Sequence, residues 1–230
     1  MSLEEDLRSD VATIFRERWQ TRNGKVVPDA EKLALGNEGV QLDATVLYAD
    51  MSGSTALVDK YLTTRSAELY KTYLYCAAKA IRAEGGEITA YDGDRVMGIF
   101  VGDFKNTSAA HAAMKINFAR CQIINPASKQ QYGTDAYQIE HAVGIDSSPL
   151  MAARTGVRGA NDLVWVGRAA NYAAKLTELP ASYTYITEAV YERLHQTAKE
   201  SGSGDPMWQA VAWTQMQNVT IYRSNWWRRM

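Results

Sequence analysis

Two aspartates, Asp50 and Asp94, lie at the ends of apolar segments, where a lone charge is costly. Asp50 closes the apolar run 44–49, and Asp94 stands in a tight turn that leads into the run 95–101. Each carboxylate is therefore expected at the end or start of a buried strand, where a metal ion is the usual compensation. Two carboxylates that share two divalent cations are the standard arrangement for in-line displacement at phosphorus.

The segment after Asp50 has the composition of a phosphate-binding turn. Gly53 allows the backbone to approach a ligand closely, and a helix that starts here would favour a phosphate at its N-terminus. Hydroxyl donors flank this glycine at Ser52, Ser54 and Thr55. Both segments also have a simpler interpretation, because Ser-Gly-Ser-Thr is a common helix N-cap and Asp-Gly is a common hairpin turn.

A third group of polar residues stands in the segment 167–176, which follows a short apolar run and opens a predicted helix. Asn171 and Lys175 are four residues apart and so share one helical face. An amide and a cation placed there can orient a ribose and stabilise charge on a phosphate. The alternative is an ordinary solvated helix surface.

The elements that must position these residues alternate along the chain. Hydrophobic periodicity and breaker residues predict helices, strands and loops in an order typical of an α+β sandwich with a mainly antiparallel sheet covered by helices. The predicted helices are 3–20, a region ending at Gly85-Gly86, 106–124, 168–178 and 188–199. The predicted strands are 43–50, 87–91, 95–101, 137–146, 163–166, 183–186 and a hairpin in 207–223, with irregular segments at 21–42, 150–162 and 201–206.

Composition excludes several classes of protein. The chain has 230 residues, 46% of them hydrophobic, and a net charge of −1. These values indicate one sizeable domain, or one domain with extensions, and argue against a dedicated nucleic-acid binder. No apolar stretch is long enough to cross a bilayer, and the acidic N-terminus lacks a signal-peptide pattern. Cys76 and Cys121 show no metal spacing, so we expect reduced thiols in a cytoplasmic protein.

Three segments, 48–55, 92–100 and 167–176, together resemble the motifs of the class III adenylate/guanylate cyclase catalytic domain in order and spacing. The resemblance covers about residues 42–190 and implies the ferredoxin-like sandwich of that family. We therefore expect an N-terminal helix and extension at 1–41, a cyclase domain at 42–200, and a C-terminal hairpin and tail at 201–230 that completes it.

The resemblance implies a role for each matching residue. Asp50, Asp94 and the Met51 carbonyl would hold two Mn²⁺ or Mg²⁺ ions per active site, and the ribose 3′-hydroxyl of a nucleoside triphosphate would attack the α-phosphorus. Asn171 would orient the ribose, and Lys175 would stabilise the transition state where the family usually has Arg. The family works as a head-to-tail dimer, which implies a homodimer with active sites at its interface.

The departures from the family concern the base. Purine-specific members carry a Lys and an Asp or Thr at the positions of Ala90 and Val164, so both expected purine contacts are missing. A compact cyclase of this kind resembles the Pycsar pyrimidine cyclases, which make cyclic UMP or cyclic CMP as an antiphage signal for a separate effector. We favour UTP slightly over CTP, although no residue in the sequence decides between them. A purine cyclase with other base contacts and a catalytically silent regulatory module are the alternatives.

Further side chains are candidates for substrate contact. Tyr48 stands two residues before Asp50, on the same strand face, and either contacts the base or ribose or packs the strand. Arg154, Arg158 and Arg168 are candidates for the triphosphate, and each is equally compatible with a solvated loop cation.

Overall fold

In the computed structural model, which describes residues 2–157 and 159–230, the long strand β2 (Glu38–Ser52) forms the centre of the sheet. It pairs antiparallel with β4 (Arg95–Val101) on one side and with β5 (Glu140–Val157) on the other. The middle of β2 is rich in valine, leucine and alanine and is almost entirely buried, as a strand covered on both faces should be.

The described strands form one nine-stranded sheet in the order β3-β4-β2-β5-β7-β9-β8, with β1 paired to β2 and β6 paired to β5. Only the β1–β2 and β5–β7 pairs are parallel within the described residues. The sheet is therefore mainly antiparallel, which confirms the predicted α+β class. The remaining strands are β1 (Gln20–Asn23), β3 (Glu87–Asp92), β6 (Ala160–Val166), β7 (Tyr183–Thr187), β8 (Gln209–Trp213) and β9 (Val219–Ser224).

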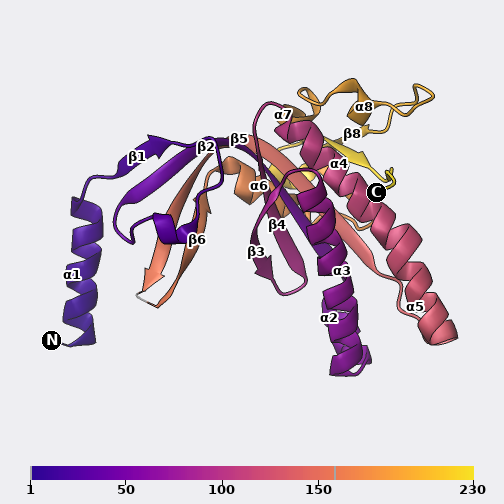
Figure 1. The fold of residues 1–230 in the computed structure, drawn as a ribbon, viewed down its shortest axis with the longest axis horizontal. Coiled ribbons are helices and arrows are strands. Elements are labelled where there is room, and N and C mark those ends of the chain that lie inside the picture. The colour runs from indigo at the N-terminus through magenta and orange to yellow at the C-terminus, as the bar shows by residue number, and fades with distance from the viewer. Residues whose placement is uncertain (1, 158) are drawn as a thin grey trace.

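Helices cover both faces of this sheet (Figure 1). One face carries α3 (Thr63–Ala83) and a long continuous helix made of α4 (Lys105–Phe118), a π-helical stretch (Ala119–Ile124) and α5 (Asn125–Tyr132). The other face carries α6 (Arg168–Leu176). The hydrophobic core is thus split into two clusters by the sheet. Helix α1 (Leu3–Arg16) stands away from both layers (Figure 1), and none of its residues is buried.

The predicted loop at 150–162 is wrong. Strand β5 continues to Val157, and β6 begins at Ala160, so the two form a long antiparallel hairpin. Its glycines serve the hairpin: a Cβ at Gly156 would collide with the backbone of Ala160 and Asn161, and Gly159 has a φ of +86° in the turn. Long-range pairing here outweighs the local breaker signal.

Other predicted boundaries need smaller corrections. The helix predicted at 3–20 ends at Arg16, and the segment predicted as irregular contains β1, a 3₁₀ turn (Ala30–Lys32) and the start of β2. The helix predicted at 106–124 continues to Tyr132. The helix predicted at 188–199 is two short pieces, α7 (Glu188–Tyr191) and α8 (Gln196–Lys199). The predicted C-terminal hairpin is confirmed as β8 and β9.

The remaining helical elements of the described chain are the short helix α2 (Ser54–Lys60) and two further 3₁₀ segments (Gly133–Asp135, Thr214–Met216). Over the described residues, no helix combines the length and apolar character that a membrane span requires. The division at residues 41 and 200 stays a prediction, although the C-terminal hairpin extends the same sheet as the central strands.

Candidate active site

Strand β2 sorts its side chains between the two faces of the sheet and so places Tyr48 and Asp50 together. Leu47 and Met51 pack in the cluster under α3 and α4, whereas Val46 and Tyr48 pack against the cluster under α6. The alternation puts Asp50 on the α6 face as well. The Asp50 carboxylate confirms this by lying 3.4 Å from the Thr177 hydroxyl, which follows α6 directly.

The register of β2 and β4 brings Asp50 and Asp94 side by side. Asp50 pairs with Arg95, the first residue of β4, and Asp94 is its neighbour in the turn between β3 and β4. The turn is the predicted Asp92-Gly93 hairpin, in which Gly93 has a φ of +60°. Two aspartates that are 44 positions apart in the printed sequence thus meet at one end of the sheet.

The electrostatics of this pair suit a cation. Burial raises the pKa of Asp50 above its ordinary value, and the charge of Asp94 raises it further, while Arg95 lowers it. The buried Oδ2 atom of Asp94 has no hydrogen-bond partner among the described residues. An orphaned carboxylate oxygen beside a second carboxylate costs free energy unless a cation binds there.

The donor set also fits magnesium or manganese. No group of three or more His, Cys, Asp or Glu side chains with metal-binding geometry occurs in the parts of the chain that the structure describes. Mg²⁺ commonly uses one or two carboxylates and completes its shell with water and substrate phosphate oxygens. Asp50, Asp94 and the main-chain carbonyl of Met51 supply the protein's share of such a shell.

The turn after β2 has the geometry expected of a phosphate cradle. Gly53 adopts a left-handed conformation, with φ +76° and ψ +21°, as the residue before α2. This conformation favours glycine and turns the chain sharply from strand to helix. Ser52 and Ser54 are half-buried, and Gly53 and Thr55 are exposed, so all four predicted residues line the same turn beside Asp50.

Helix α6 lies close against the sheet because Gly144 of β5 leaves room for it. A Cβ at Gly144 would collide with the carbonyl oxygen of Ala173. The opposite face of α6 exposes Asn171 and Lys175. Neither side chain makes a hydrogen bond or ion pair with Asp50 or Asp94 in the described residues, so no such bond joins the two carboxylates to Asn171 or Lys175 within one chain.

Comparison with known proteins identifies the family. The chain is 55% identical over 230 residues to a uridylate cyclase of Xanthomonas perforans, covering 99% of each chain. It is 49% identical over 228 residues to a uridylate cyclase of Burkholderia cepacia, covering 98% of each. The chain belongs to the uridylate cyclase family. No protein-family model matches it.

The fold agrees with this identification. The crystal structure of the adenylyl cyclase CyaB from P. aeruginosa superposes with a TM-score of 0.69 at 20% identity, covering 84% of this chain and 98% of that one. The molecule is therefore a nucleotide cyclase with the class III fold, as the three motifs predicted.

In this cyclase Tyr48 lies beneath the guanidinium of Arg95, 5.1 Å from the centroid of its ring. Arg95 also donates a hydrogen bond of 2.8 Å to Asp92. One ring face of Tyr48 is therefore occupied by a cation–π contact. The hydroxyl and the other ring face are the parts left for a substrate contact, since the residue is only half-buried.

The two positions expected to carry purine contacts both lie at the surface of the cyclase. Ala90 is exposed on β3, next to an irregularity in its pairing with β4, and Val164 is 39% exposed on β6. Neither offers a hydrogen-bonding side chain. A bound purine would therefore miss the expected partners at both positions.

Arg168 is engaged within its own chain. Its guanidinium donates to the Asp146 carboxylate at 3.1 Å and to the Ser147 carbonyl at 3.0 Å, and Thr187 also donates to Asp146. Burial raises the pKa of Asp146, so the pairing compensates a fully buried carboxyl. It leaves Arg168 fewer donors for a triphosphate, and its predicted substrate contact stays a prediction.

The other two arginines give no further support to the site. Arg154 donates to the Asn161 side chain at 2.7 Å and to the Leu33 carbonyl at 3.0 Å, which ties β5 and β6 to the N-terminal segment. Arg158 lies outside the described residues. Cys76 and Cys121 are free and half-buried, as expected for reduced thiols.

Sequence reasoning missed a buried pair on the other face of the sheet. The Tyr73 hydroxyl of α3 lies 3.1 Å from His141 Nδ1, and both residues are completely buried or nearly so. His141 pairs with Met51 in the β2–β5 ladder, directly after Asp50. The charges of Asp50 and Asp94 contribute, after burial, to a raised pKa of Tyr73, which places this pair close to the carboxylates. The only sequence signal was a histidine on the apolar face of a strand.

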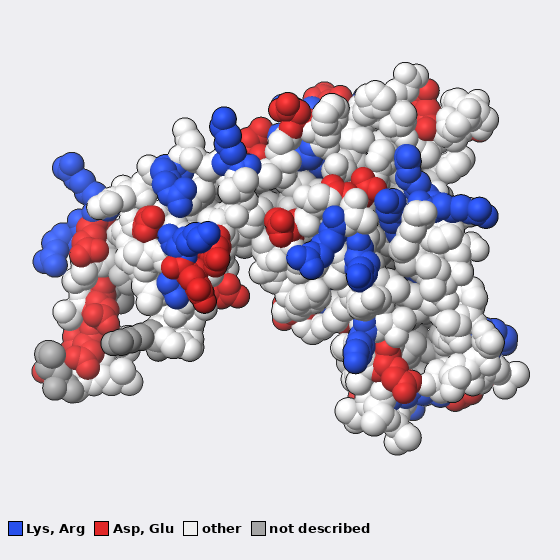
Figure 2. Space-filling model, in the orientation of Figure 1, with Lys and Arg blue, Asp and Glu red and all other residues white. Residues whose placement is uncertain are grey.

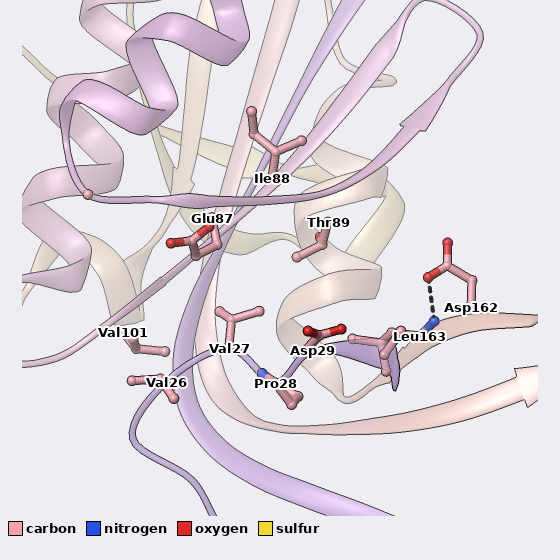
Figure 3. Close-up of a pocket in the computed structure, with 12 residues that line it drawn as sticks. Val26, Val27, Pro28, Asp29, Glu87, Ile88, Thr89, Val101, Asp162 and Leu163 are labelled. Atoms are coloured by element: carbon pink, nitrogen blue, oxygen red, sulfur yellow. Dashed lines mark hydrogen bonds between the residues drawn. The ribbon is translucent and has the colours of Figure 1, made fainter. Parts of the chain in front are cut away.

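A separate cavity of about 520 Å³ opens between β3, β6 and the segment 26–30 (Figure 3). Asp29, Glu87 and Asp162 stand around it, whereas Asp50 and Asp94 are not among its lining residues. Three carboxylates would repel a triphosphate, so this cavity is unsuited to the nucleotide phosphates.

Proposed function

We propose that this cyclase converts UTP to 3′,5′-cyclic UMP and pyrophosphate, with CTP as the alternative pyrimidine substrate. The observation that carries the proposal is the Asp50–Asp94 pair, in which the buried Asp94 Oδ2 has no hydrogen-bond partner among the described residues. The chain is also 55% identical to a uridylate cyclase. In the reaction a bond forms between the ribose 3′-oxygen and the α-phosphorus. The bond from that phosphorus to the pyrophosphate oxygen breaks, and the 3′-hydroxyl proton passes to solvent.

Asp50, Asp94 and the Met51 carbonyl would hold two Mn²⁺ or Mg²⁺ ions. Such ions, when bound, would lower the pKa of the 3′-hydroxyl and neutralise triphosphate charge. The chain's own contribution is to fix the two carboxylates by the strand register. Ser52, Gly53, Ser54 and Thr55 would receive the phosphates through backbone N–H groups and hydroxyls.

A second copy of the chain would complete each site. Asn171 and Lys175 are exposed and make no hydrogen bond or ion pair with Asp50 or Asp94 of their own chain, which supports a head-to-tail homodimer. Asn171 of one copy would then orient the ribose held by the other. Lys175 would stabilise the charge that develops on the phosphorus; it carries the charge of the family's Arg without the planar fork.

Selection of the base would rest on missing purine contacts as well as on a contact that the chain provides. Ala90 and Val164 offer nothing to a purine, and Tyr48 would contact the uracil or the ribose. Cyclic UMP would act as an antiphage signal on a separate effector in the cytoplasm. The choice of UTP is supported by the relatives, which are named uridylate cyclases.

The test is incubation of the purified protein with Mn²⁺ and equimolar ATP, GTP, CTP and UTP, with products identified by mass spectrometry. We expect cyclic UMP as the dominant product, and none from the double variant Asp50→Ala, Asp94→Ala. Cyclic AMP or cyclic GMP as the main product would refute pyrimidine selectivity. Product from the double variant would refute the carboxylate site.

A further inference from the structure

Helix α1 carries an apolar stripe that no other described segment of its own chain covers. Leu3, Leu7, Val11, Ile14 and Phe15 recur at helical spacing and are between 48% and 86% exposed. Isolated helices of this length are marginal in water, and an amphipathic helix gains most of its stability by burying its apolar face. The stripe therefore indicates a docking surface.

The helix is nevertheless capped at its N-terminus and hydrogen-bonded to the rest of the chain at its C-terminus. Ser2 and Glu5 form a complete capping box at its N-terminus. At its C-terminus the Asn37 side chain donates to the carbonyls of Ile14 and Glu17, both at 2.8 Å. These bonds tie the helix to the residue before β2, and α1 projects from the body as an arm (Figure 1).

A groove between α3 and β3 has the complementary composition. Its cavity of about 570 Å³ is lined by Tyr75, Ala78, Lys79, Arg82, Ile88 and Tyr91, among others. Tyr75 and Tyr91 are 62% and 57% exposed. Lys71 lies one turn before Tyr75 on the same helical face. The groove thus has an apolar floor with cations along it.

Charge and length match between the two surfaces. Helix α1 holds four acidic residues against two basic ones, and Asp6 and Asp10 have no ion pair in the described part of the chain. Leu3 to Ile14 and Lys71 to Arg82 each contain twelve residues of helix, on the order of 16 Å from first to last. A helix laid along α3 would bring its acidic flank to the cations of the groove.

The arm and the groove stand on opposite sides of a hollow in one molecule. Figure 2 shows this hollow between the part of the surface formed by α1 and β6 and the part formed by α3 and β3, with acidic groups along α1. We propose that α1 of one copy docks, apolar face inward, into the α3–β3 groove of a second copy. The inference rests on the proposed dimer, to which it adds two symmetry-related contacts.

Photo-crosslinking tests the occupant directly. A benzophenone amino acid in place of Leu7 in the full chain should give an adduct of twice the chain mass, with the crosslinked peptide drawn from residues 71–91. The same probe at Val58, which is 47% exposed on α2, should give no adduct with that peptide. An adduct within one chain, an adduct to another segment or no adduct at all would overturn the proposal.

Charge reversal tests the pairing. The variant Asp6→Lys, Asp10→Lys should raise the dimer dissociation constant by about tenfold, and adding Lys79→Glu, Arg82→Glu should restore it. The matched control Asp59→Lys, Asp103→Lys reverses two exposed acids outside α1 and should leave it unchanged. If the variant with all four substitutions does not recover the wild-type dissociation constant, the proposed pairing of α1 with the groove is wrong. Neither measurement needs nucleotide, so a negative result in either leaves the proposed cyclase reaction untouched. Conversely, absence of cyclic UMP from a protein that still forms the crosslink would refute only the proposed reaction.

Discussion

Asp50 lies directly opposite Arg95 in the antiparallel pair of β2 and β4, and this pairing sets Asp94 beside it. A shift of one residue would turn every side chain of β2 to the other face of the sheet. The register therefore determines both the meeting of the two carboxylates and the contact of Arg95 with Tyr48. Asp92 pairs with the same Arg95, so three carboxylates with one neighbouring cation leave an excess of two negative charges, which a divalent cation would neutralise.

Replacement of Asp50 by asparagine should stabilise the metal-free protein while removing its metal response. The folded-state pKa of Asp50 lies above its unfolded value of 3.8. The contribution of Asp50 to the free energy of unfolding is therefore fully present below pH 3.8 and is lost as the pH rises through the folded-state pKa. At pH 7 we expect Asp50→Asn to raise the melting temperature by about 2 °C or more. Mn²⁺ at 100 times its Kd should stabilise the wild type by about 2.7 kcal/mol.

The readout is differential scanning calorimetry with and without Mn²⁺. The variant Asp59→Asn, which removes an exposed carboxylate from α2, serves as the control and should keep the full Mn²⁺ response. An equal Mn²⁺ shift in wild type and Asp50→Asn would show that the ion binds elsewhere.

Two inactive variants should complement each other if the site is shared between copies. When equal amounts of the Asp50→Ala and Lys175→Ala proteins exchange subunits to equilibrium, half of the dimers are heterodimers. Each heterodimer has one intact site. The activity should recover to about a quarter of the wild-type value by the two-fold symmetry of the dimer. The measurement is cyclic product formed per chain, compared with each variant alone.

The mixture of Asp50→Ala and Asp94→Ala is the matched control for that experiment. Both carboxylates come from one chain, as the β2–β4 register shows, so every heterodimeric site lacks one of them and no recovery is expected. Recovery in this control, or none in the first mixture, would contradict the assignment of Lys175 to the opposite copy.

Restoring the missing purine contacts should relax the choice of base. The double variant Ala90→Lys, Val164→Asp changes two exposed positions, where substitutions cost within about 0.5 kcal/mol. We expect the ratio of kcat/KM for UTP to that for ATP to fall by about tenfold or more, mainly through a gain with ATP. The control Val166→Asp lies two residues further on the same face of β6 and should leave this ratio unchanged.

The carboxylate pair was predictable because its signals are local. An apolar run that ends in Asp50 and the Asp-Gly turn before β4 each occupy a few consecutive residues, and each lies at the predicted position. The contacts that complete the site join distant residues: Thr177 with Asp50 across 127 positions, and Tyr73 with His141 across 68. No local pattern specifies such pairs.

The same distinction explains the error at residues 150–162. Gly156, Gly159 and the arginines of this segment indicate a loop when they are taken with their sequence neighbours alone. In the fold, β5 is already aligned by β2 over its first part, and pairing with β6 extends that alignment to Val157. The pairing within the sheet therefore specifies the hairpin, and the two glycines allow the backbone conformation that this hairpin requires.

His141 should make stability fall as the solution is acidified. Burial lowers its pKa from 6.5 to about 3, with a smaller contribution from Arg120. Between pH 6.5 and pH 3, His141 binds a proton in the unfolded chain but not in the folded chain. Its contribution to the free energy of unfolding is therefore fully present above pH 6.5 and is lost as the pH falls toward 3. The slope from this one group reaches about 1.4 kcal/mol per pH unit.

Urea unfolding at several pH values between 7 and 4 measures this contribution as the difference between wild type and His141→Gln. The raised pKa values of Asp50 and Asp146 act in the opposite direction, but they are common to both proteins and cancel in the difference. His195→Gln makes the same substitution at an exposed histidine and serves as the matched comparison. A His141→Gln slope equal to that of the wild type would mean that the Tyr73–His141 pair accepts a proton without cost, contrary to its complete burial.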